Sequence, residues 1–364
     1  MTSAYMRRAI ELAESVAGTT SPNPNVGCVL VRDGAVVGEG ATRPPGQAHA
    51  EIVALEAAGD AARGATAYVT LEPCSHTGRT APCADALIAA GVAAVHAGVQ
   101  DPNPRVAGEG IARLRAAGIE VTVGDGASEI SRQLEAFLHY HRAGRPFVIA
   151  KFAATLDGKI AAASGDSRWV AGEEARAWAH AFRARVDAIM CGVNNVLLDD
   201  PQLTARPGGA LAGRQPLRIV ADSRGRTPLS AKVLNQDART VVATTDAAPR
   251  AWRDAVAATG AEVLVLPADG DGRVDLRALV EDLAQREVLS LLVEGGGVLH
   301  ASFFAAGLVD KVHAIIAPKI VGGTAYPAVA GEGAAHMADA VMLQDVETHR
   351  LGDDVAFVGY LRRD

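Results

Sequence analysis

The sequence predicts two α/β domains joined near residue 145. Segments with strand character alternate with segments of helical periodicity, a pattern that places helices on the faces of a sheet. At 364 residues, the chain is too long for one ordinary domain. Glycine and proline give residues 142–146 the character of a linker, because both interrupt regular elements. We therefore expect one domain at 1–145 and a second at 146–364.

The first half is predicted to alternate between helices and strands. Ile10, Ala13 and Val16 recur at helical spacing, and Asp33-Gly34 is a two-residue hairpin turn between two strands. Gly59 and Gly91 follow the segments 49–58 and 82–90, and helices commonly end at such a glycine. We predict helices at 3–17, 49–58, 82–90, 105–117 and 128–145, and strands at 27–31, 35–38, 67–71, 92–99 and 119–123.

The second half contains short apolar runs that are typical of buried strands. These runs predict strands at 147–154, 188–192, 218–221, 241–243, 263–266, 289–293 and 311–317. Helices are predicted at 173–185 and 297–306. A sheet with helices on its faces is therefore expected in this half as well.

Composition and charge restrict the class of protein. The hydrophobic content of 49% is enough for substantial cores, and the net charge of −7 gives no basic bias typical of nucleic-acid binders. Beyond Cys74 and Cys83 only Cys28 and Cys191 remain, too few for a disulfide framework. The sequence shows neither a signal-peptide pattern nor an apolar run long enough to predict a membrane span. We expect a cytoplasmic protein that acts on small molecules, without nucleic-acid or membrane partners.

Four residues of the first half have the spacing of a catalytic zinc site. His49, Cys74 and Cys83 supply three metal ligands, and Glu51 stands two residues after the first. Three protein ligands leave a fourth position for water, which zinc can activate near neutral pH. A neighbouring carboxylate can move protons, the role that we predict for Glu51. His49 and Cys83 are predicted to open helices, whose amino termini favour the thiolate that binds metal.

Two plainer interpretations compete with this one. A structural zinc site would be closed by four Cys or His ligands, with His76 as the candidate for the fourth. Glu51 by itself would be an ordinary surface residue of a helix. Only three ligands occur in matching helix-start and strand-end contexts, so the sequence favours the catalytic site.

The order of these motifs is similar to that of zinc nucleobase deaminases. A generic cytidine deaminase has two residues between its cysteines, whereas this chain has eight, 75–82, which include Ser-His-Thr-Gly-Arg-Thr. That insert, with Lys151–Lys159 (Lys-Phe-Ala-Ala-Thr-Leu-Asp-Gly-Lys) and Val293–Gly297 (Val-Glu-Gly-Gly-Gly), resembles the bifunctional deaminase/reductase family of riboflavin biosynthesis over essentially the whole chain. The resemblance implies a cytidine-deaminase-like three-layer αβα domain, followed by a dihydrofolate-reductase-like domain.

The resemblance also implies two activities. The first domain would bind Zn²⁺ and hydrolytically deaminate 2,5-diamino-6-ribosylamino-4(3H)-pyrimidinone 5′-phosphate by attack of zinc hydroxide. The second would use NADPH to reduce the ribosyl group, giving 5-amino-6-ribitylamino-uracil 5′-phosphate. Assembly as a homodimer or homotetramer through the reductase domain is implied as well.

Substrate contacts in the first domain are implied for loop residues. By default these are turn or solvated loop positions; the resemblance assigns contacts with the pyrimidine, ribose and phosphate to Asn23, His76, Arg79, Asp101 and Asn103. Thr42 stands where many family members have a histidine, which removes one expected phosphate contact. Arg43 is the candidate to replace it.

The second domain lacks the Gly-x-Gly-x-x-Gly of a Rossmann fold. Its Glu294-Gly295-Gly296-Gly297 lies between a predicted strand and helix, where backbone amides can approach a cofactor phosphate. The resemblance implies cofactor contacts at Ala153, Trp169, Asn195, Asp199, Ser223, Gly296 and Gly297. Substrate contacts are expected at Lys151, Ser167, Arg183, Leu203, Arg206 and Glu294. Without the resemblance, Arg183 and Arg206 would be assigned to a solvated helix face and loop, and Asn195 departs from the small hydroxyl residue expected there.

Three other functions remain as alternatives. A deaminase with an inactive reductase domain fits because the second-half motifs are less specific. An RNA nucleobase deaminase is disfavoured by the missing basic bias and the long insert between the cysteines. A non-enzymatic nucleotide-binding protein is disfavoured by the intact His49, Glu51, Cys74 and Cys83.

Overall fold

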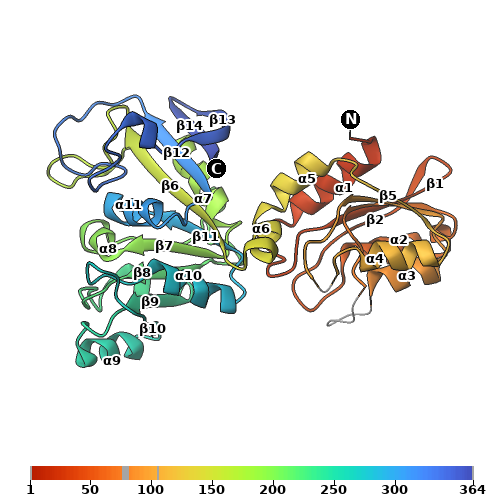
Figure 1. The fold of residues 1–364 in the computed structure, drawn as a ribbon, viewed down its shortest axis with the longest axis horizontal. Coiled ribbons are helices and arrows are strands. Elements are labelled where there is room, and N and C mark those ends of the chain that lie inside the picture. Colours follow the sequence, from red (N-terminus) through yellow and green to blue (C-terminus); the bar gives the residue numbers. More distant parts are fainter. Residues whose placement is uncertain (1, 76–81, 105, 363–364) are drawn as a thin grey trace. The chain divides into compact units, whose positions relative to one another are not determined.

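The computed structural model describes residues 2–75, 82–104 and 106–362. The chain divides into two compact units, Met1–Arg145 and Pro146–Asp364. Each unit is built on its own sheet with helices packed against it, so the predicted α/β fold class is confirmed (Figure 1). Within the described residues no helix is long and apolar enough to cross a membrane.

The sheet of the first unit is mixed. Over the described part of that unit it contains five strands in the order β2-β1-β3-β4-β5. β1 pairs antiparallel with β2 and β3, whereas β3, β4 and β5 run parallel, which brings the carboxyl ends of β3 and β4 to one edge. The strands are β1 (Gly27–Arg32), β2 (Ala35–Ala41), β3 (Thr66–Leu71), β4 (Ala94–Val99) and β5 (Glu120–Val123).

Helices cover both faces of this sheet and give the three layers that the resemblance implies (Figure 1). On one face lie α1 (Ala4–Ser15) and α5 (Ala127–Gln133); on the other lie α2 (Ala50–Ala58), α3 (Cys83–Ala90) and α4 (Glu109–Ala116). The 3₁₀ turn η1 (Gly59–Ala62) follows α2, and α6 (Glu135–Ala143) follows α5. The single helix predicted at 128–145 is therefore wrong, because Leu134 leaves helical geometry with φ −98° and ψ 13°.

The sheet of the second unit is mostly parallel. Across residues 146–362 it has nine strands in the order β10-β9-β8-β7-β11-β6-β12-β14-β13. Neighbours from β10 through β12 are parallel, and β14 and β13 complete it antiparallel. The strands are β6 (Phe147–Thr155), β7 (Ala188–Gly192), β8 (Leu217–Ala221), β9 (Thr240–Thr244), β10 (Glu262–Val265), β11 (Ser290–Glu294), β12 (Lys311–Ala317), β13 (Leu343–Leu351) and β14 (Asp354–Leu361).

The helices of the second unit pack on this sheet. They are α7 (Glu173–Arg183), α8 (Val193–Asp199), α9 (Arg250–Ala258), α10 (Leu276–Gln285) and α11 (Gly297–Ala305), with 3₁₀ turns η2 (Pro207–Gly209), η3 (Lys232–Leu234) and η4 (Met337–Asp339). Fully buried Val148, Met190, Leu291, Leu279 and Phe303 form part of a core shared by the central strands, α10 and α11.

Among the α-helices and strands of the described second unit, five were not predicted from the sequence: α8, α9, α10, β13 and β14. Helix α8 is only seven residues long, and its ends carry no side-chain cap. Strand β13 is almost entirely exposed and mostly polar, so it lacks the apolar pattern by which the buried strands were recognised.

Helix α1 approaches β1 so closely that one position requires glycine. A Cβ atom added at Gly27 would lie 1.9 Å from the carbonyl oxygen of Ala9 and 2.9 Å from the backbone nitrogen of Ala13. Both neighbours are backbone atoms of a helix, which cannot move without loss of its packing.

We predict that Gly27→Ala destabilises the first unit by about 2–3 kcal/mol, because the added methyl group forces α1 away from the sheet. Urea unfolding followed by circular dichroism measures this change. Gly213→Ala is the control, since a Cβ there meets nothing within 4 Å, and its effect should stay within about 0.5 kcal/mol. Equal unfolding midpoints for the two variants would contradict the prediction.

Candidate active sites

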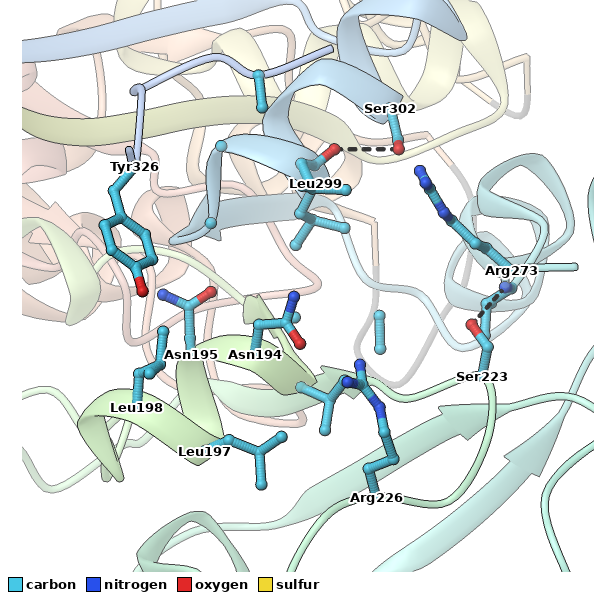
Figure 2. A pocket seen from close by; sticks show the side chains of 18 of the residues that line it. Asn194, Asn195, Leu197, Leu198, Ser223, Arg226, Arg273, Leu299, Ser302 and Tyr326 are labelled. Carbon is cyan, nitrogen blue, oxygen red and sulfur yellow. Dashed lines mark hydrogen bonds between the residues drawn. The ribbon is translucent and has the colours of Figure 1, made fainter. Parts of the chain in front are cut away.

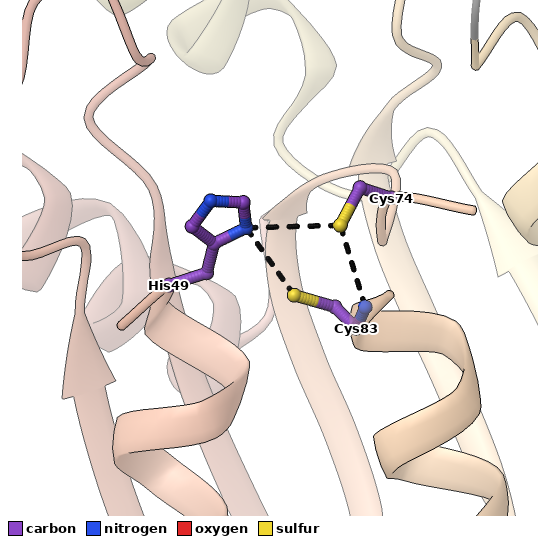
Figure 3. Close-up of side chains that lie close together, drawn as sticks. All are labelled: His49, Cys74 and Cys83. Atoms are coloured by element: carbon purple, nitrogen blue, oxygen red, sulfur yellow. Dashed lines mark hydrogen bonds between the residues drawn. The ribbon is translucent and has the colours of Figure 1, made fainter. Parts of the chain in front are cut away.

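The three predicted metal ligands converge where β3 ends (Figure 3). His49 Nδ1 lies 3.7 Å from Cys74 Sγ and 3.4 Å from Cys83 Sγ, and the three ligand atoms all lie within 4.8 Å of one another. Tetrahedral zinc with ordinary bond lengths would hold a nitrogen and a sulfur about 3.6 Å apart. The donor set and its spacing therefore fit a zinc ion with three protein ligands.

The elements that hold these ligands also set their acid–base properties. His49 immediately precedes α2, Cys83 is the first residue of α3, and the Cys83 backbone N–H donates to Cys74 Sγ at 3.3 Å. Hydrogen bonds from Cys83 and His49 lower the pKa of Cys74 despite its burial. A hydrogen bond with Cys74, and next burial, raise the pKa of Cys83. The pocket thus favours one thiolate before any metal binds.

Glu51 lies beside the ligands, in the first turn of α2. Its side chain is hydrogen-bonded to Cys83, and only 4% of the residue is exposed. Burial, and next the negative charge of Cys74, raise the pKa of its carboxyl to about 7. A buried carboxyl group with a pKa near neutrality therefore lies beside the three candidate metal ligands.

A second buried carboxylate, Glu72, organises the loop on this edge. It follows β3 and accepts backbone N–H groups of Asp101 and Gly108 at Oε2 and of Gly110 and Ile111 at Oε1, at 3.0–3.2 Å. The loop after β4 is thereby fixed against the strand end that carries Cys74. The sequence analysis missed Glu72, although its position just before Pro73-Cys74 was a signal.

The predicted substrate residues of this unit have different surroundings. Asp101 is buried, its Oδ1 accepts the Asn103 backbone N–H at 2.8 Å, and burial raises its pKa to about 6. Asn23 lies in the connection from α1 to β1, where its backbone N–H donates to the Thr20 carbonyl. The predicted contacts of His76 and Arg79 lie outside the described residues.

Thr42 and Arg43 both have partners within the protein. The buried Thr42 hydroxyl accepts the Val26 N–H at 3.1 Å and donates to the Val26 carbonyl at 3.4 Å. Arg43 extends toward Glu56, with 4.0 Å between their charged atoms. Thr42 therefore stabilises the end of β2, in place of the phosphate contact that a histidine would offer.

In the second unit, Glu294 joins two predicted substrate residues. Its Oε1 lies 2.6 Å from Lys151 Nζ, and its Oε2 lies 2.5 Å from Arg183 Nη2. These groups come from β11, β6 and α7, and the three side chains are at most 17% exposed. Burial opposes ionisation of Glu294, but the charges of Arg183 and Lys151 outweigh it and lower its pKa to about 2.

The surroundings of this cluster are cationic. Arg206 lies close enough to Arg183 for their charges to interact, and its backbone N–H donates to His180 Nδ1 at 3.3 Å. Burial, and next the charges of Arg183 and Arg206, lower the pKa of His180 to about 4. One carboxylate thus faces several cations, an arrangement suited to a phosphate.

The loop after α8 is held in an unusual conformation. Leu203 is buried and has φ +51°, a region that branched or bulky side chains rarely adopt. On either side of it, the Gln202 carbonyl accepts from the fully buried Arg218 and the Thr204 carbonyl accepts from Arg183. A strained residue held this firmly is typical of a ligand-binding position.

A cavity of about 850 Å³ opens at the carboxyl ends of β7, β8 and β11 (Figure 2). Ligands of parallel α/β sheets commonly bind at this edge. Six predicted residues line the cavity: Ser167, Asn195, Asp199, Ser223, Gly296 and Gly297. Ser167 Oγ donates to Asp199 Oδ1 at 2.8 Å, and the Ser223 hydroxyl accepts the Val274 N–H at 3.0 Å.

The glycine turn at the start of α11 fits a cofactor phosphate. Gly295 and Gly296 have φ +119° and +81°, and a Cβ at either one would lie 2.7 Å from the Asn195 side chain. The buried Asn195 Oδ1 has no hydrogen-bond partner within the described residues. Glycine backbone at a helix amino terminus and an amide oxygen with no partner among the described residues suit a dinucleotide such as NADPH.

Ala153 and Trp169, also predicted to contact the cofactor, are not among the residues that line this cavity. Ala153 lies on β6, and Trp169 is 62% exposed with the Arg176 guanidinium 4.6 Å from its ring centre. The sequence analysis missed two arginines that do line the cavity, Arg226 and Arg273. Arg226 follows shortly after a predicted parallel strand, and this position was an available signal.

We predict that Glu294→Gln destabilises the second unit by about 3 kcal/mol at pH 7, because two largely buried cations lose their counter-charge. The folded-state pKa is depressed from 4.5 to about 2. The stabilisation is therefore complete above about pH 4.5 and is lost as the pH falls toward 2. Urea unfolding from pH 7 to pH 2 should show the two proteins converging in acid; a constant gap would contradict the prediction.

Two family models match the chain. The RibD C-terminal domain matches residues 146–357, and the zinc-binding region of cytidine and deoxycytidylate deaminases matches residues 1–99. The riboflavin biosynthesis protein RibD of Synechocystis is 45% identical over 359 residues, covering 98% of this chain and 95% of that protein. RibD of Escherichia coli is 44% identical over 363 residues, covering 96% and 97%.

Solved structures agree with these matches. RibD of Acinetobacter baumannii superposes with a TM-score of 0.89 at 37% identity, covering 99% of this chain and 98% of that one. A deaminase/reductase of Thermotoga maritima, described as acting on diaminohydroxyphosphoribosylaminopyrimidine and 5-amino-6-(5-phosphoribosylamino)uracil, gives 0.84 at 34% identity, covering 99% and 98%. Because the similarity spans both units, the chain belongs to the RibD family of riboflavin biosynthesis proteins.

Proposed function

We propose that this chain catalyses two consecutive steps of riboflavin biosynthesis. Residues 1–145 would deaminate 2,5-diamino-6-ribosylamino-4(3H)-pyrimidinone 5′-phosphate, and residues 146–364 would reduce the ribosyl group of the product with NADPH. The observation that carries the proposal is the triad of His49, Cys74 and Cys83 beside the buried Glu51. The similarity to RibD proteins over nearly the whole chain supports both halves.

In the deamination, a ring carbon exchanges its amino group for the oxygen of water, and ammonia leaves. Zinc, when bound, makes a nucleophile available from water near neutral pH. Glu51 would accept the proton of that water and pass protons to the ring nitrogen and the departing amine. Asn23, Asp101 and Asn103, with His76 and Arg79, would hold the pyrimidine and the ribose phosphate.

In the reduction, NADPH supplies a hydride to the open-chain imine or aldehyde form of the sugar, giving the ribityl chain. The protein contributes orientation and electrostatics. Arg183 and Arg206 would grip the phosphate, because a guanidinium can bind it through two hydrogen bonds. Further substrate contacts would come from Lys151, Ser167, Leu203 and Glu294, and cofactor contacts from Ala153, Trp169, Asn195, Asp199, Ser223, Gly296 and Gly297.

The two activities can be tested in one incubation. The zinc-loaded protein is mixed with the diaminopyrimidine ribosyl phosphate and NADPH, and the masses of the products are measured by mass spectrometry. A product with both mass changes is expected. Deamination alone would remove the reductase half of the proposal, and an unchanged substrate would remove the riboflavin assignment.

We predict that Glu51→Gln lowers the deamination rate by about 10²-fold or more, because the amide cannot accept the proton of the water. Zinc content should remain that of the native protein, since Glu51 is not one of the three ligands. Reduction of the already deaminated substrate should also be unchanged. Glu56→Gln, on the same helix and 59% exposed, is the matched control. Equal deamination rates for the two variants would contradict the role of Glu51.

We further propose that the protein resides in the cytoplasm and assembles through its second unit as a homodimer or homotetramer. The free cysteines of the described residues suit a reducing compartment. Ile320, Met337, Met342 and Phe357 expose apolar side chains, and β13 is an exposed edge strand. Surfaces of this kind are commonly covered by another chain.

We predict that the wild-type protein elutes as an oligomer in size-exclusion chromatography with light scattering. The double variant Met337→Glu/Met342→Glu should shift it toward the monomer, because charges on a buried apolar interface are destabilising. A monomeric wild-type protein would contradict this assembly. An oligomer that the double variant leaves intact would place the interface elsewhere.

A further inference from the structure

We propose that Arg226 and Arg273 form the subsite that selects NADPH over NADH, by binding the phosphate on the 2′ position of the adenosine ribose. This inference rests on the reductase half of the proposed function. Both guanidinium groups line the cavity at the carboxyl ends of the parallel strands. Figure 2 shows Arg273 extending toward Ser302 and Arg226 extending into the cavity from the loop after β8. The loops that carry them are joined by the hydrogen bond from the Val274 N–H to the Ser223 hydroxyl.

The cavity gives the cofactor a direction. Its lining includes Ser167, Asp199 and Tyr326, the glycine turn before α11, and the loops that carry the two arginines. Figure 2 shows Tyr326 and Asn195 on one side of the cavity and Arg273 on the other. The reacting ring must lie near the substrate residues, and the pyrophosphate fits the amino terminus of α11. The adenosine half then reaches the loops that carry Arg226 and Arg273.

Over the described ranges of the chain, neither guanidinium group has a charged partner. Neither forms an ion pair or a side-chain hydrogen bond with any residue that the structure describes, whereas Arg183 and Arg214 pair with buried carboxylates. Two carboxylates line the same cavity. Asp269 Oδ1 accepts the backbone N–H groups of Asp271 and Arg273 in its own turn, and Asp271 is exposed without an ion pair of its own among these residues. The charges of the two arginines and the two aspartates cancel, so these four side chains together do not repel an anion.

The backbone that carries each arginine is fixed. The buried Asp222 carboxylate accepts the N–H groups of Arg226 and Thr227 at 2.7 and 2.6 Å, which holds the loop after β8. Asp269 fixes the turn before Arg273, and the Ser223 hydroxyl accepts the N–H of Val274, which ties the two loops together. Preorganised loops let the two cations meet the phosphate without first ordering the backbone.

The chemistry of the two cofactors gives the selectivity. NADPH carries a phosphate where NADH carries a hydroxyl group. An arginine accommodates that phosphate, whereas an acidic residue hydrogen-bonds the free hydroxyl in enzymes that use NADH. Guanidinium groups bind phosphate through paired, charge-assisted hydrogen bonds that the hydroxyl cannot replace. The two arginines therefore stabilise bound NADPH and contribute little to bound NADH.

The test is direct binding by calorimetry, with NADPH and NADH as separate ligands and no substrate present. Arg226→Ala and Arg273→Ala should each weaken NADPH binding about tenfold and leave the Kd for NADH within about twofold of wild type. The double variant should lose most of the preference, and added salt should weaken the wild-type preference. Arg250→Ala, which removes an 88%-exposed guanidinium on α9 outside the cavity, is the matched control.

The outcomes distinguish failure of the arginine assignment from failure of the reductase proposal. Equal losses for both cofactors, or no loss for either, would overturn the assignment of these arginines and leave the reductase proposal standing, provided that the wild-type protein binds NADPH. A wild-type protein that binds neither cofactor would overturn both. Arg226→Lys and Arg273→Lys add a finer criterion, because lysine keeps the charge without the two-pronged contact and should give intermediate preferences.

Discussion

Both sites depend on the parallel pairing of neighbouring strands. Parallel strands end at the same edge of a sheet, and the helices that follow them begin there. In the first unit, β3 leads to Cys74 and β4 leads to Asp101. The other two candidate ligands, His49 and Cys83, lie at the starts of α2 and α3. In the second unit, β7, β8 and β11 lead to the loops around the cavity. Parallel strand pairing thus brings functional residues from distant parts of the chain to one edge of each sheet.

Buried carboxylates then hold these edges in place by different means. Glu72 binds four backbone N–H groups and so fixes a loop without a counter-ion. Glu294 is held by the charges of Lys151 and Arg183, and joins a strand edge to α7. A carboxylate satisfied by neutral donors shapes a loop, whereas one satisfied by cations also sets the charge of a site. The second arrangement suits a pocket that has to accept a phosphate.

The two units differ in how specifically their residues signal a function. Metal ligands are few in kind and have strict spacing, so His49, Cys74 and Cys83 could be recognised without a structure. Phosphate sites are built from arginines and backbone amides, which also occur widely on ordinary surfaces. For that reason Arg226 and Arg273 stand out only in the structure, where they line the cavity and form no ion pair with any residue that is described.

The sequence by itself determined the α/β class, most strands and helices, and the grouping of His49, Cys74 and Cys83 as candidate metal ligands, because apolar periodicity and ligand spacing are local signals. It misjudged the break at Leu134 and omitted α8 and β13, where a single backbone angle, short length or exposure weakens those signals. Only the tertiary structure decided that Glu294 pairs with two largely buried cations, and that the Thr42 hydroxyl binds Val26. These contacts join residues distant in the chain, and their energies depend on burial and separation, which no local pattern encodes.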